Sequence, residues 1–442
     1  RLPAMSPQQI LSRLTDRYAL LTRGTRTAPT RQQTLRLCID WSHELCTPTE
    51  QRVWSRLSVF AGSVELDTAE QVCGVGLDPG ELLDVVASLV DKSILIREES
   101  GAGVRFRLLE TLRDYGRERL QRSGEYLELR RRHRDWYQQL TLDAEADWIG
   151  ARQLEWIARL GREQPNLREA LEFCATDSPD SGLRLAAALF PFWLSQGRFT
   201  EGRRWLDRFL AHPEEAPTSE RVKARFAGSV LAALQGQFQV AAALVAEARE
   251  LADASTDPMI GALVAYSEGM LAVFSGDPRR ALAHLEGALE RFGEWCAPDH
   301  VLRIGALYML GTAHELLGDI DPAIGYYERV LAITEACGES MYRAYALWGI
   351  GVAAWREGDP DRSAGLLEQS LRLARKVNNP RTIATDLEAL AWIAADNRDA
   401  HRAVVLLAAA RSWDTPSAAS RWSSPICSST TRSASARVAR RW

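Results

Sequence analysis

The sequence predicts an all-α fold that carries one small β-hairpin, and three observations support this prediction. Apolar residues recur at helical spacing through most of the 442 residues. One pair of short strand-like segments flanks a glycine-containing turn in the first third of the chain. In the second half, a pattern centred on glycine returns about every 40 residues, as in repeat proteins.

The composition excludes several classes of protein. The chain is 46% hydrophobic and 25% charged, with a net charge of −4, so it has no overall attraction to nucleic acid or to an anionic membrane. Its apolar stretches, such as residues 185–194, are too short to span a bilayer. The seven cysteines are scattered without a CxxC pair, which favours a reducing, cytoplasmic compartment.

The first third of the chain begins with a series of predicted helices. Ser6 is placed to cap the first helix, with Pro7 at its first helical position. Thr47 and Glu50 have the spacing of a capping box at the start of the third helix. The helices are expected at residues 6–22, 33–45, 48–60, 67–73 and 81–91.

A β-hairpin is predicted directly after these helices. Residues 93–96 and 104–107 are rich in β-branched and apolar side chains, and residues 100–103 supply the turn. A further helix is expected at residues 109–120. The order helix–helix–helix–hairpin is typical of a winged helix, so residues 25–125 are predicted to form a winged-helix-like domain.

Helical repeats are predicted from residue 126 to residue 410. Each repeat has one anchor residue that ends a helix, where glycine or asparagine accepts the left-handed conformation, and another helix follows it. The anchors are Gly197, Gly236, Gly276, Gly318, Gly358 and Asn397, which lie 39, 40, 42, 40 and 39 residues apart.

Small residues recur at two further points of each repeat. Ala241, Ala281, Ala323, Gly202 and Ser363 follow their anchors by five residues, whereas the last unit has Arg402 there and Ala403 one step later. Gly269, Gly311 and Gly351 precede their anchors by seven. Such residues let two helices approach closely, so the pattern predicts an α-solenoid of tetratricopeptide-like hairpins, with a longer period than the usual 34 residues.

Residues 411–442 depart from this pattern. Helical periodicity ends after Ala410, and serine, threonine and arginine dominate the rest of the chain. Two interpretations remain open at this point, a disordered tail and the out-of-frame translation of a GC-rich gene.

Several short segments of the first 210 residues resemble one family. Two of them are Leu57-Ser58-Val59-Phe60-Ala61-Gly62 and Gln164-Pro165-Asn166-Leu167. The others are residues 31–35, 39–42, 89–93, 106–115, 168–171 and 202–206. Together they resemble the part that follows the nucleotide-binding domain in bacterial signal-transduction ATPases (STAND proteins) of the actinobacterial LuxR and AfsR types.

The resemblance implies a division of labour among domains. In that family an upstream NB-ARC-type domain binds ATP or ADP, the winged helix clamps it, the repeats sense a ligand or partner, and a separate domain binds DNA. Residues 1–24 would then be the end of a truncated nucleotide-binding or helical domain. The chain opens without methionine and is expected to be part of a longer protein. A related arrangement behind a nucleotide cyclase domain stays open.

The chain departs from the family in two nucleotide-related features. It has no GxxxxGK[ST] loop, so no cofactor is expected here, and ATP or ADP is expected only in the upstream domain. Leu108-Leu109-Glu110 stands where related ATPases have Met-His-Asp, and leucine donates no hydrogen bond to a phosphate.

No catalytic or metal site is expected in this chain. The seven histidines lack the spacing of metal ligands, and no nucleophile motif is present. Direct DNA binding is not expected either, because the helix at residues 81–91 carries Glu81, Asp84 and Asp91. A salt-sensitive mobility shift at submicromolar concentration would contradict that expectation.

Aromatic residues recur at one point of four consecutive repeats. Phe226, Tyr266, Tyr308 and Trp348 each precede an anchor by ten residues. Together with Trp355 and Arg356 they are predicted to line a concave groove that binds a protein or small-molecule effector. The alternative is that these rings only fill the interfaces between repeats.

These observations lead to two functional hypotheses. The first is a sensor and regulatory part of a signal-transduction ATPase that controls transcription, in which effector binding at the repeats biases the contacts of the winged helix. The second is a free-standing tetratricopeptide-like scaffold for protein–protein interaction.

Overall fold

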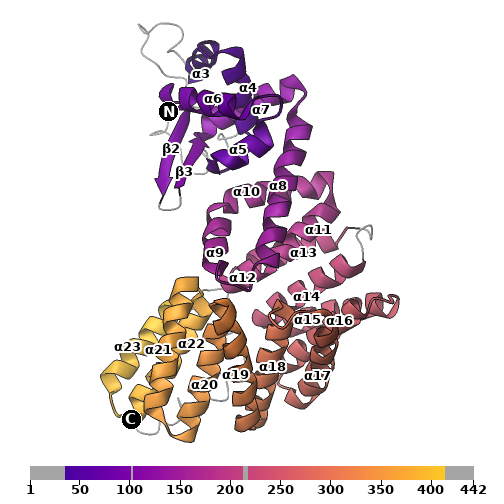
Figure 1. Cartoon of the computed structure of the whole chain (residues 1–442), viewed down its shortest axis with the longest axis vertical. Helices are drawn as coiled ribbons and strands as arrows, with labels where there is room; N and C mark the ends of the chain where they lie inside the picture. The colour runs from indigo at the N-terminus through magenta and orange to yellow at the C-terminus, as the bar shows by residue number, and fades with distance from the viewer. Residues whose placement is uncertain (1–34, 101–102, 213–217, 414–442) are drawn as a thin grey trace, which may run out of the picture. The chain divides into compact units, whose positions relative to one another are not determined.

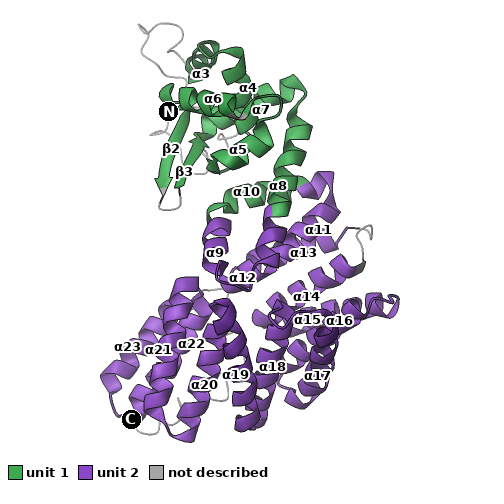
Figure 2. Cartoon of the chain, in the orientation of Figure 1, with its two compact units in different colours: residues 1–139, 162–173 green, residues 140–161, 174–442 purple. Residues whose placement is uncertain are grey.

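The computed structural model describes residues 35–100, 103–212 and 218–413, which form a helical chain with one small sheet (Figure 1). Two compact units divide it (Figure 2). The winged-helix unit comprises residues 1–139 and 162–173, and the repeat unit comprises residues 140–161 and 174–442. The predictions for residues 1–24 and for the tail beyond residue 413 lie outside the described residues. Within the described ranges, no helix has both the length and the hydrophobicity to cross a membrane.

From residue 35 onward, the winged-helix unit contains the predicted helices with their ends shifted by a few residues. The helix predicted at residues 6–22 lies outside the described residues. Thr47 Oγ1 accepts a hydrogen bond from the Glu50 backbone N–H at 3.3 Å, and a carboxylate oxygen of Glu50 accepts one from the Thr47 N–H at 2.6 Å. The predicted capping box is therefore confirmed. The helices are α3 (Leu35–Glu44), α4 (Pro48–Leu57), α5 (Leu66–Cys73), α6 (Pro79–Asp91) and α7 (Glu110–Ser123).

The sheet of this unit has one strand more than predicted. The hairpin consists of β2 (Leu95–Ser100) and β3 (Gly103–Leu108), and β1 (Val64–Glu65) pairs antiparallel with the other side of β3. At two residues, β1 is too short to produce a periodic signal in the sequence. Ser93, predicted as the first strand residue, instead has a φ of 56° in the turn that follows α6.

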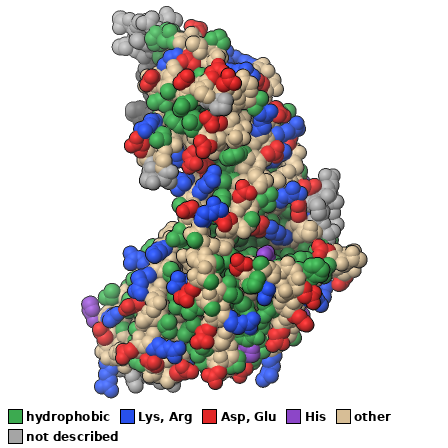
Figure 3. All heavy atoms as spheres, in the orientation of Figure 1, with side chains coloured by type: hydrophobic (Ala, Val, Ile, Leu, Met, Phe, Trp, Pro, Cys, Tyr) green, Lys and Arg blue, Asp and Glu red, His purple; other side chains and the backbone are tan. Residues whose placement is uncertain are grey.

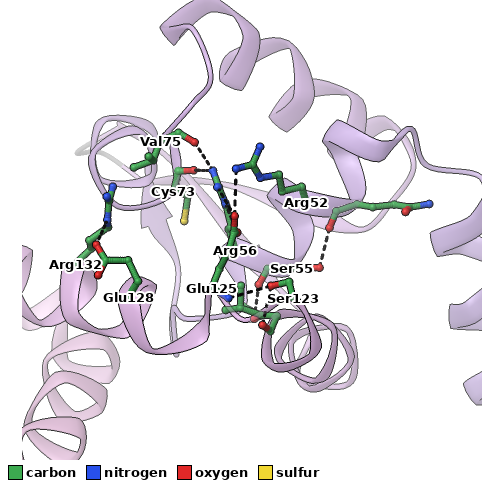
Figure 4. A network of polar contacts seen from close by, with 12 residues as sticks. Arg52, Ser55, Arg56, Cys73, Val75, Ser123, Glu125, Glu128 and Arg132 are labelled. Atoms are coloured by element: carbon green, nitrogen blue, oxygen red, sulfur yellow. Dashed lines mark hydrogen bonds and ion pairs between the residues drawn. The ribbon is translucent and has the colours of Figure 1, made fainter. Parts of the chain in front are cut away.

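Arg56 is buried at the centre of a polar network that joins several helices of the unit (Figure 4). Its guanidinium donates two hydrogen bonds of 3.0 Å to the carboxylate of Glu125. It also donates to the carbonyl oxygens of Cys73 at 2.9 Å and Val75 at 2.6 Å. Because Arg56 hydrogen-bonds to Glu125, the pKa of that carboxyl is lowered. This network fixes the end of α5 and the segment after α7 onto α4.

A second buried network involves Arg105 of β3 and the start of α10 (Gln164–Asp177). Arg105 donates to Glu163 at 2.5 Å and to Glu65 at 2.7 Å. Glu163 also accepts from Tyr137 at 2.7 Å and from Asn166 at 2.9 Å. Tyr137 lies in α8 (Tyr126–Ala146), so one carboxylate holds a strand and two helices together.

Asn166 explains why two of the family-like segments occur together. Its side-chain oxygen accepts hydrogen bonds from the backbone N–H groups of Ala61 (2.9 Å) and Gly62 (3.0 Å). The segments Leu57–Gly62 and Gln164–Leu167, distant in sequence, are therefore two sides of one contact.

The repeat unit consists of helical hairpins whose paired helices lie side by side (Figure 1). It begins with the end of α8 and α9 (Gln153–Arg162), which lead into the repeats. The helices that follow are α11 (Pro179–Ala188), α12 (Phe190–Ser195), α13 (Phe199–Leu210), α14 (Thr218–Leu234), α15 (Phe238–Asp253), α16 (Pro258–Phe274), α17 (Pro278–Trp295), α18 (Val301–Leu317), α19 (Ile320–Cys337), α20 (Met341–Glu357), α21 (Pro360–Val377), α22 (Pro380–Asp396) and α23 (Ala400–Trp413).

The anchor residues adopt the predicted conformation in every unit except the last. The five glycine anchors have φ angles from 65° to 87°. Asn397 instead has a φ of −76°, and Arg398 takes the left-handed conformation with a φ of 58°. The prediction at Asn397 was therefore wrong by one residue. With Arg398 as anchor, the buried Ala403 falls five residues later, as in the other units.

The small residues lie at the crossings of the hairpins, as predicted. A Cβ atom placed on Gly269 would lie 2.6 Å from Leu285, and one on Gly311 would lie 2.6 Å from the ring of Tyr327. One on Gly351 would lie 3.0 Å from Leu367. Each partner belongs to the next helix along the chain, so glycine is what permits these helices to pack so closely.

Candidate functional site

Contacts between segments distant in sequence bring the two ends of the repeat unit together. Gln196, which follows α12, donates a hydrogen bond to the carbonyl oxygen of Val377 at the end of α21 at 2.9 Å. A Cβ atom on Gly197 would lie 2.9 Å from Pro380, the first residue of α22. The interior side of the hairpins is therefore partly enclosed.

A second closing contact joins α9 to the start of α20. The Gln153 side chain donates to Glu339 at 2.6 Å, and its oxygen accepts from the backbone N–H groups of Ser340 (3.0 Å) and Met341 (3.1 Å). Glu339 also accepts from the N–H groups of Met341 and Tyr342. Burial raises the pKa of Glu339, while these donors oppose the rise. The first turn of α20 is thus held by two side chains.

The smaller interior cavity has a volume of about 130 Å³ and contains three of the predicted aromatic residues, Tyr266, Tyr308 and Trp348. The structure adds two tyrosines of α20 to its wall, Tyr342 and Tyr345, and polar residues from the start of α22. Those polar residues are Asn379, Arg381, Thr382 and Thr385.

The larger interior cavity has a volume of about 640 Å³. Phe226, the fourth predicted aromatic residue, lines it together with Phe190 and Leu263. The end of α8 contributes Glu145 and Ala146. Glu145 accepts a hydrogen bond of 2.5 Å from Lys223, so these two opposite charges in the cavity wall neutralise each other.

Tyr266 and Tyr342 line both cavities and therefore mark the place where the cavities meet. They are only 3% and 9% exposed. Their hydroxyl groups have no hydrogen-bond partner among the described residues. Burial raises the pKa of both, so both hydroxyls keep their protons and can donate to a ligand.

The aromatic residues also contact one another between neighbouring repeats. The ring centroids of Phe226 and Tyr266 are 5.4 Å apart, and those of Tyr308 and Tyr345 are also 5.4 Å apart. The rings thus fill the interfaces between repeats and line the cavities at the same time. Effector binding at these rings stays a prediction.

Trp355 and Arg356 line neither cavity. Trp355 donates from its indole nitrogen to Asp396 at 2.8 Å, and its ring lies 5.4 Å from that of Trp392. Arg356 forms an ion pair of 3.3 Å with the buried carboxylate of Glu315. These two residues therefore hold neighbouring repeats together, away from the other four predicted residues.

Sequence reasoning missed Tyr342, Tyr345 and Arg381 as cavity residues. Tyr345 was detectable, because it precedes Trp348 by three residues and so lies beside it on α20, and Tyr342 in turn precedes Tyr345 by three. Arg381 gave no such signal. It reaches the cavity from the first turn of the next hairpin, which only the folded arrangement reveals.

The surface of the winged-helix unit was considered as a second site. Helix α6 exposes Glu81, Leu83 and Asp84. Lys92, beside its end, donates to the carboxylate of Glu50 at 2.5 Å. On the face shown in Figure 3, acidic and basic side chains are interspersed. The exposed face of α6 therefore lacks the positive charge that phosphate contacts require.

Comparison with protein families confirms the two kinds of module. Residues 47–121 match the family model described as a winged helix-turn-helix domain. Residues 262–336 match the family model described as a tetratricopeptide repeat. The predictions of a winged helix and of tetratricopeptide-like repeats are therefore confirmed.

Relatives among curated proteins come from mycobacteria. The chain is 40% identical over 214 residues to a Mycobacterium tuberculosis (strain H37Rv) protein named "Putative HTH-type transcriptional regulator", covering 48% of this chain and 24% of the relative. It is 36% identical over 127 residues to an uncharacterized Mycobacterium bovis protein, covering 28% of this chain and 32% of that protein. The chain thus spans about a quarter of the length of the first relatives it matches.

Among solved structures, one similar protein is a Signal Transduction ATPase with Numerous Domains that has a tetratricopeptide repeat sensor, from Pyrococcus horikoshii. The sequence identity is 14%, the TM-score is 0.47, and the match covers 89% of this chain and 61% of that chain.

Proposed function

We propose that this chain is the sensing and coupling part of a transcriptional regulator of the LuxR- or AfsR-type signal-transduction ATPases, acting in the cytoplasm. The repeat unit binds an effector, and the winged-helix unit transmits the bound state to an ATPase domain that carries the ATP or ADP. The chain itself performs no catalysis and holds no cofactor. The two matched domain families and the name of the mycobacterial relatives support this proposal.

The observation that carries the proposal is the pair of adjoining aromatic cavities inside the repeat unit. A cavity of about 640 Å³ is within the usual range for small-molecule sites. The walls carry two tyrosine hydroxyls that have no hydrogen-bond partner among the described residues and are therefore available to a ligand. A small effector that fills the interior fits these facts better than a protein bound to the outside of a scaffold.

The surface of α6 supports coupling through protein contacts. An exposed leucine flanked by acidic residues is suited to another protein surface, whereas DNA would meet charge of its own sign. The buried networks around Arg56 and Arg105 hold the helices of this unit in one arrangement, as a transmitting module requires.

The test uses N-phenyl-1-naphthylamine, a neutral aromatic dye whose fluorescence rises in apolar surroundings. The intact chain is titrated with the dye, and saturable binding is expected. Ala146→Trp fills the larger cavity from an exposed position on α8, so binding should weaken at least about tenfold while the melting temperature is kept.

Ala146→Ser is the matched control, because it changes the same position without filling the cavity. It should bind the dye like the unmodified chain. Equal dye affinity in Ala146→Trp and in the unmodified chain would place the dye elsewhere and would count against an interior effector site.

A further inference from the structure

Arg381 is a cationic side chain in the wall of the smaller cavity for which the structure provides no carboxylate. It is half-buried in the first turn of α22, beside Thr382 and Thr385. Among the described residues, no acidic side chain forms an ion pair with it. Its charge nevertheless acts on Tyr308 and Tyr345 across the cavity. A guanidinium without a carboxylate partner in a cavity wall is available to an anionic ligand.

The position of Arg381 in its helix is unfavourable for a cation. The N-terminal turn of a helix carries a partial positive charge, and a cation there is disfavoured. Asn379, the N-cap of α22, makes two side-chain hydrogen bonds within the protein. Its oxygen accepts from the Thr382 N–H at 3.1 Å, and its amide donates to the Tyr345 hydroxyl at 3.0 Å. At this part of the cavity wall, the Arg381 guanidinium is therefore the group that is available to hydrogen-bond to a ligand.

Another part of the cavity wall presents the two tyrosine hydroxyls that have no partner among the described residues. Both lie beside Gly305 of α18, where a Cβ atom would be 2.3 Å from the Tyr266 hydroxyl and 3.2 Å from that of Tyr342. Glycine therefore provides the space in which these hydroxyls meet. Being neutral, they can donate to an uncharged or anionic oxygen.

The rings of Tyr308 and Trp348 complete the wall. Aromatic walls favour a flat, apolar body, and a guanidinium favours a carboxylate, which matches its paired N–H groups. We propose that the smaller cavity binds the acid end of an aromatic carboxylic acid, with the carboxylate at Arg381 and the rest of the molecule extending past the hydroxyls of Tyr266 and Tyr342, where the cavities adjoin, into the larger cavity. This inference rests on the proposed effector-binding role of the repeats and names the chemical class of the effector.

The experiment compares two probes of nearly the same shape, the anionic naphthalene-2-carboxylate and the neutral naphthalene-2-carboxamide. Each is titrated into the intact chain by calorimetry at neutral pH. A charge-assisted hydrogen-bond pair is expected to favour the acid by about ten- to a hundredfold in Kd. Arg381→Gln should remove this preference, because it deletes the positive charge and leaves most of the wall unchanged.

Arg362→Gln is the matched control. Arg362 is exposed in the first turn of α21 and lines neither cavity, so this variant should keep the preference for the acid. Arg381→Lys should fall between Arg381→Gln and the unmodified chain, because it keeps the charge but loses the forked donor. Circular dichroism melting of each variant checks that the repeats remain folded.

The outcomes separate this inference from the proposed function. Equal affinity for acid and amide, or an acid preference that survives Arg381→Gln, would overturn the carboxylate inference alone. If the neutral dye still binds in the larger cavity but neither naphthalene probe binds, the carboxylate inference is also overturned while the proposed function stands. Failure of all three probes to bind would overturn both.

A carboxylate can also come from the C-terminus of a peptide. Acetyl-Leu-Phe with a free and with an amidated C-terminus forms a second pair of probes. A preference for the free acid only in the naphthalene pair assigns the site to small aromatic acids. If both pairs show a preference for the free acid and Arg381→Gln removes it in both, the site also accepts peptide C-termini. That outcome still supports a carboxylate site at Arg381.

Discussion

The interiors of the two units contain two contrasting sets of polar groups. In the winged-helix unit, Arg105 and Glu163 are both buried and both have several partners, which include Glu65, Tyr137 and Asn166. In the repeat unit, the hydroxyls of Tyr266 and Tyr342 have no partner among the described residues, and Arg381 has no counter-ion there.

This difference fits the proposed roles, in which the winged-helix unit transmits and the repeat unit binds. A buried charge with a complete set of partners holds one geometry, because moving any member strands the others. A buried hydroxyl without a partner lowers stability until something else supplies the hydrogen bond. The first arrangement suits a coupling module, and the second suits a site that is completed by its ligand.

The largest expected effect tests the winged-helix side of this comparison. Arg105→Ala would leave Glu163 as a buried, partly uncompensated carboxylate and should lower the free energy of unfolding by about 3–5 kcal/mol. Arg107→Ala, on the same strand but in an exposed pair with Glu98, should cost at most about 1 kcal/mol. Urea unfolding followed by circular dichroism measures both. Equal losses in the two variants would show that the buried network is not what holds this unit.

The second effect tests the hairpin crossings that enclose the cavities. Gly311→Ala would place a methyl group 2.6 Å from the Tyr327 ring and should destabilise the repeats by about 1–3 kcal/mol. Gly325→Ala is the matched control, since no atom lies within 4 Å of its added Cβ. It should stabilise helix α19 by about 0.5–1 kcal/mol through helix propensity. Thermal melting measures both, and a stabilised Gly311→Ala would contradict the tight crossing.

The smallest effect concerns Asp386, a wholly buried carboxyl in the repeat unit. The Ser370 hydroxyl lies 2.9 Å from the Ala344 carbonyl oxygen and 3.0 Å from Asp386. The hydroxyl can donate its single proton to only one of these two acceptors at a time, and no cation pairs with Asp386 among the described residues, so burial favours the neutral, protonated carboxyl. Burial raises the pKa of Asp386 well above its ordinary range, although the hydrogen bond to Ser370 opposes the rise.

The sign of the pH effect follows from this. Above about pH 4 the unfolded chain releases this proton while the folded chain keeps it, so stability falls as the pH rises. Asp386→Asn has no proton to release, and its amide can donate to Ser370. It should raise the free energy of unfolding at pH 7 by on the order of 1 kcal/mol and flatten its dependence on pH. Urea unfolding between pH 4 and pH 8 measures this, with the exposed Glu368→Gln as the unchanged control. A loss of stability in Asp386→Asn at pH 7 would show that the carboxyl is ionised in the folded chain.

Much of the fold was predictable because its signals are local. Thr47 and Glu50 specify a capping box at a fixed spacing, and the glycine anchors specify helix ends through their backbone freedom. The prediction failed where two local choices were nearly equivalent. At the last anchor, the chain places Arg398 rather than Asn397 in the left-handed conformation, in register with the buried Ala403.

The candidate site was predictable only in part. Tyr266, Tyr308 and Trp348 share one position of successive repeats, so their common location follows from periodicity. Trp355 and Arg356 were predicted from their spacing in the same way. In the structure they instead contact Asp396 and Glu315, away from the cavities. Spacing along a helix fixes the face on which a residue lies, but it does not fix what the neighbouring helix presents to it.

The sequence by itself determined the helices, the hairpin, the repeat period and the small residues at each crossing, because these depend on backbone conformation and contacts within one or two helices. Only the tertiary structure decided that Gln196 reaches Val377, that Gln153 holds Glu339, and that Arg381 faces the tyrosines without a counter-ion. Those contacts join residues far apart in the chain. Their geometry depends on how small rotations accumulate from one repeat to the next, and no local pattern encodes that sum.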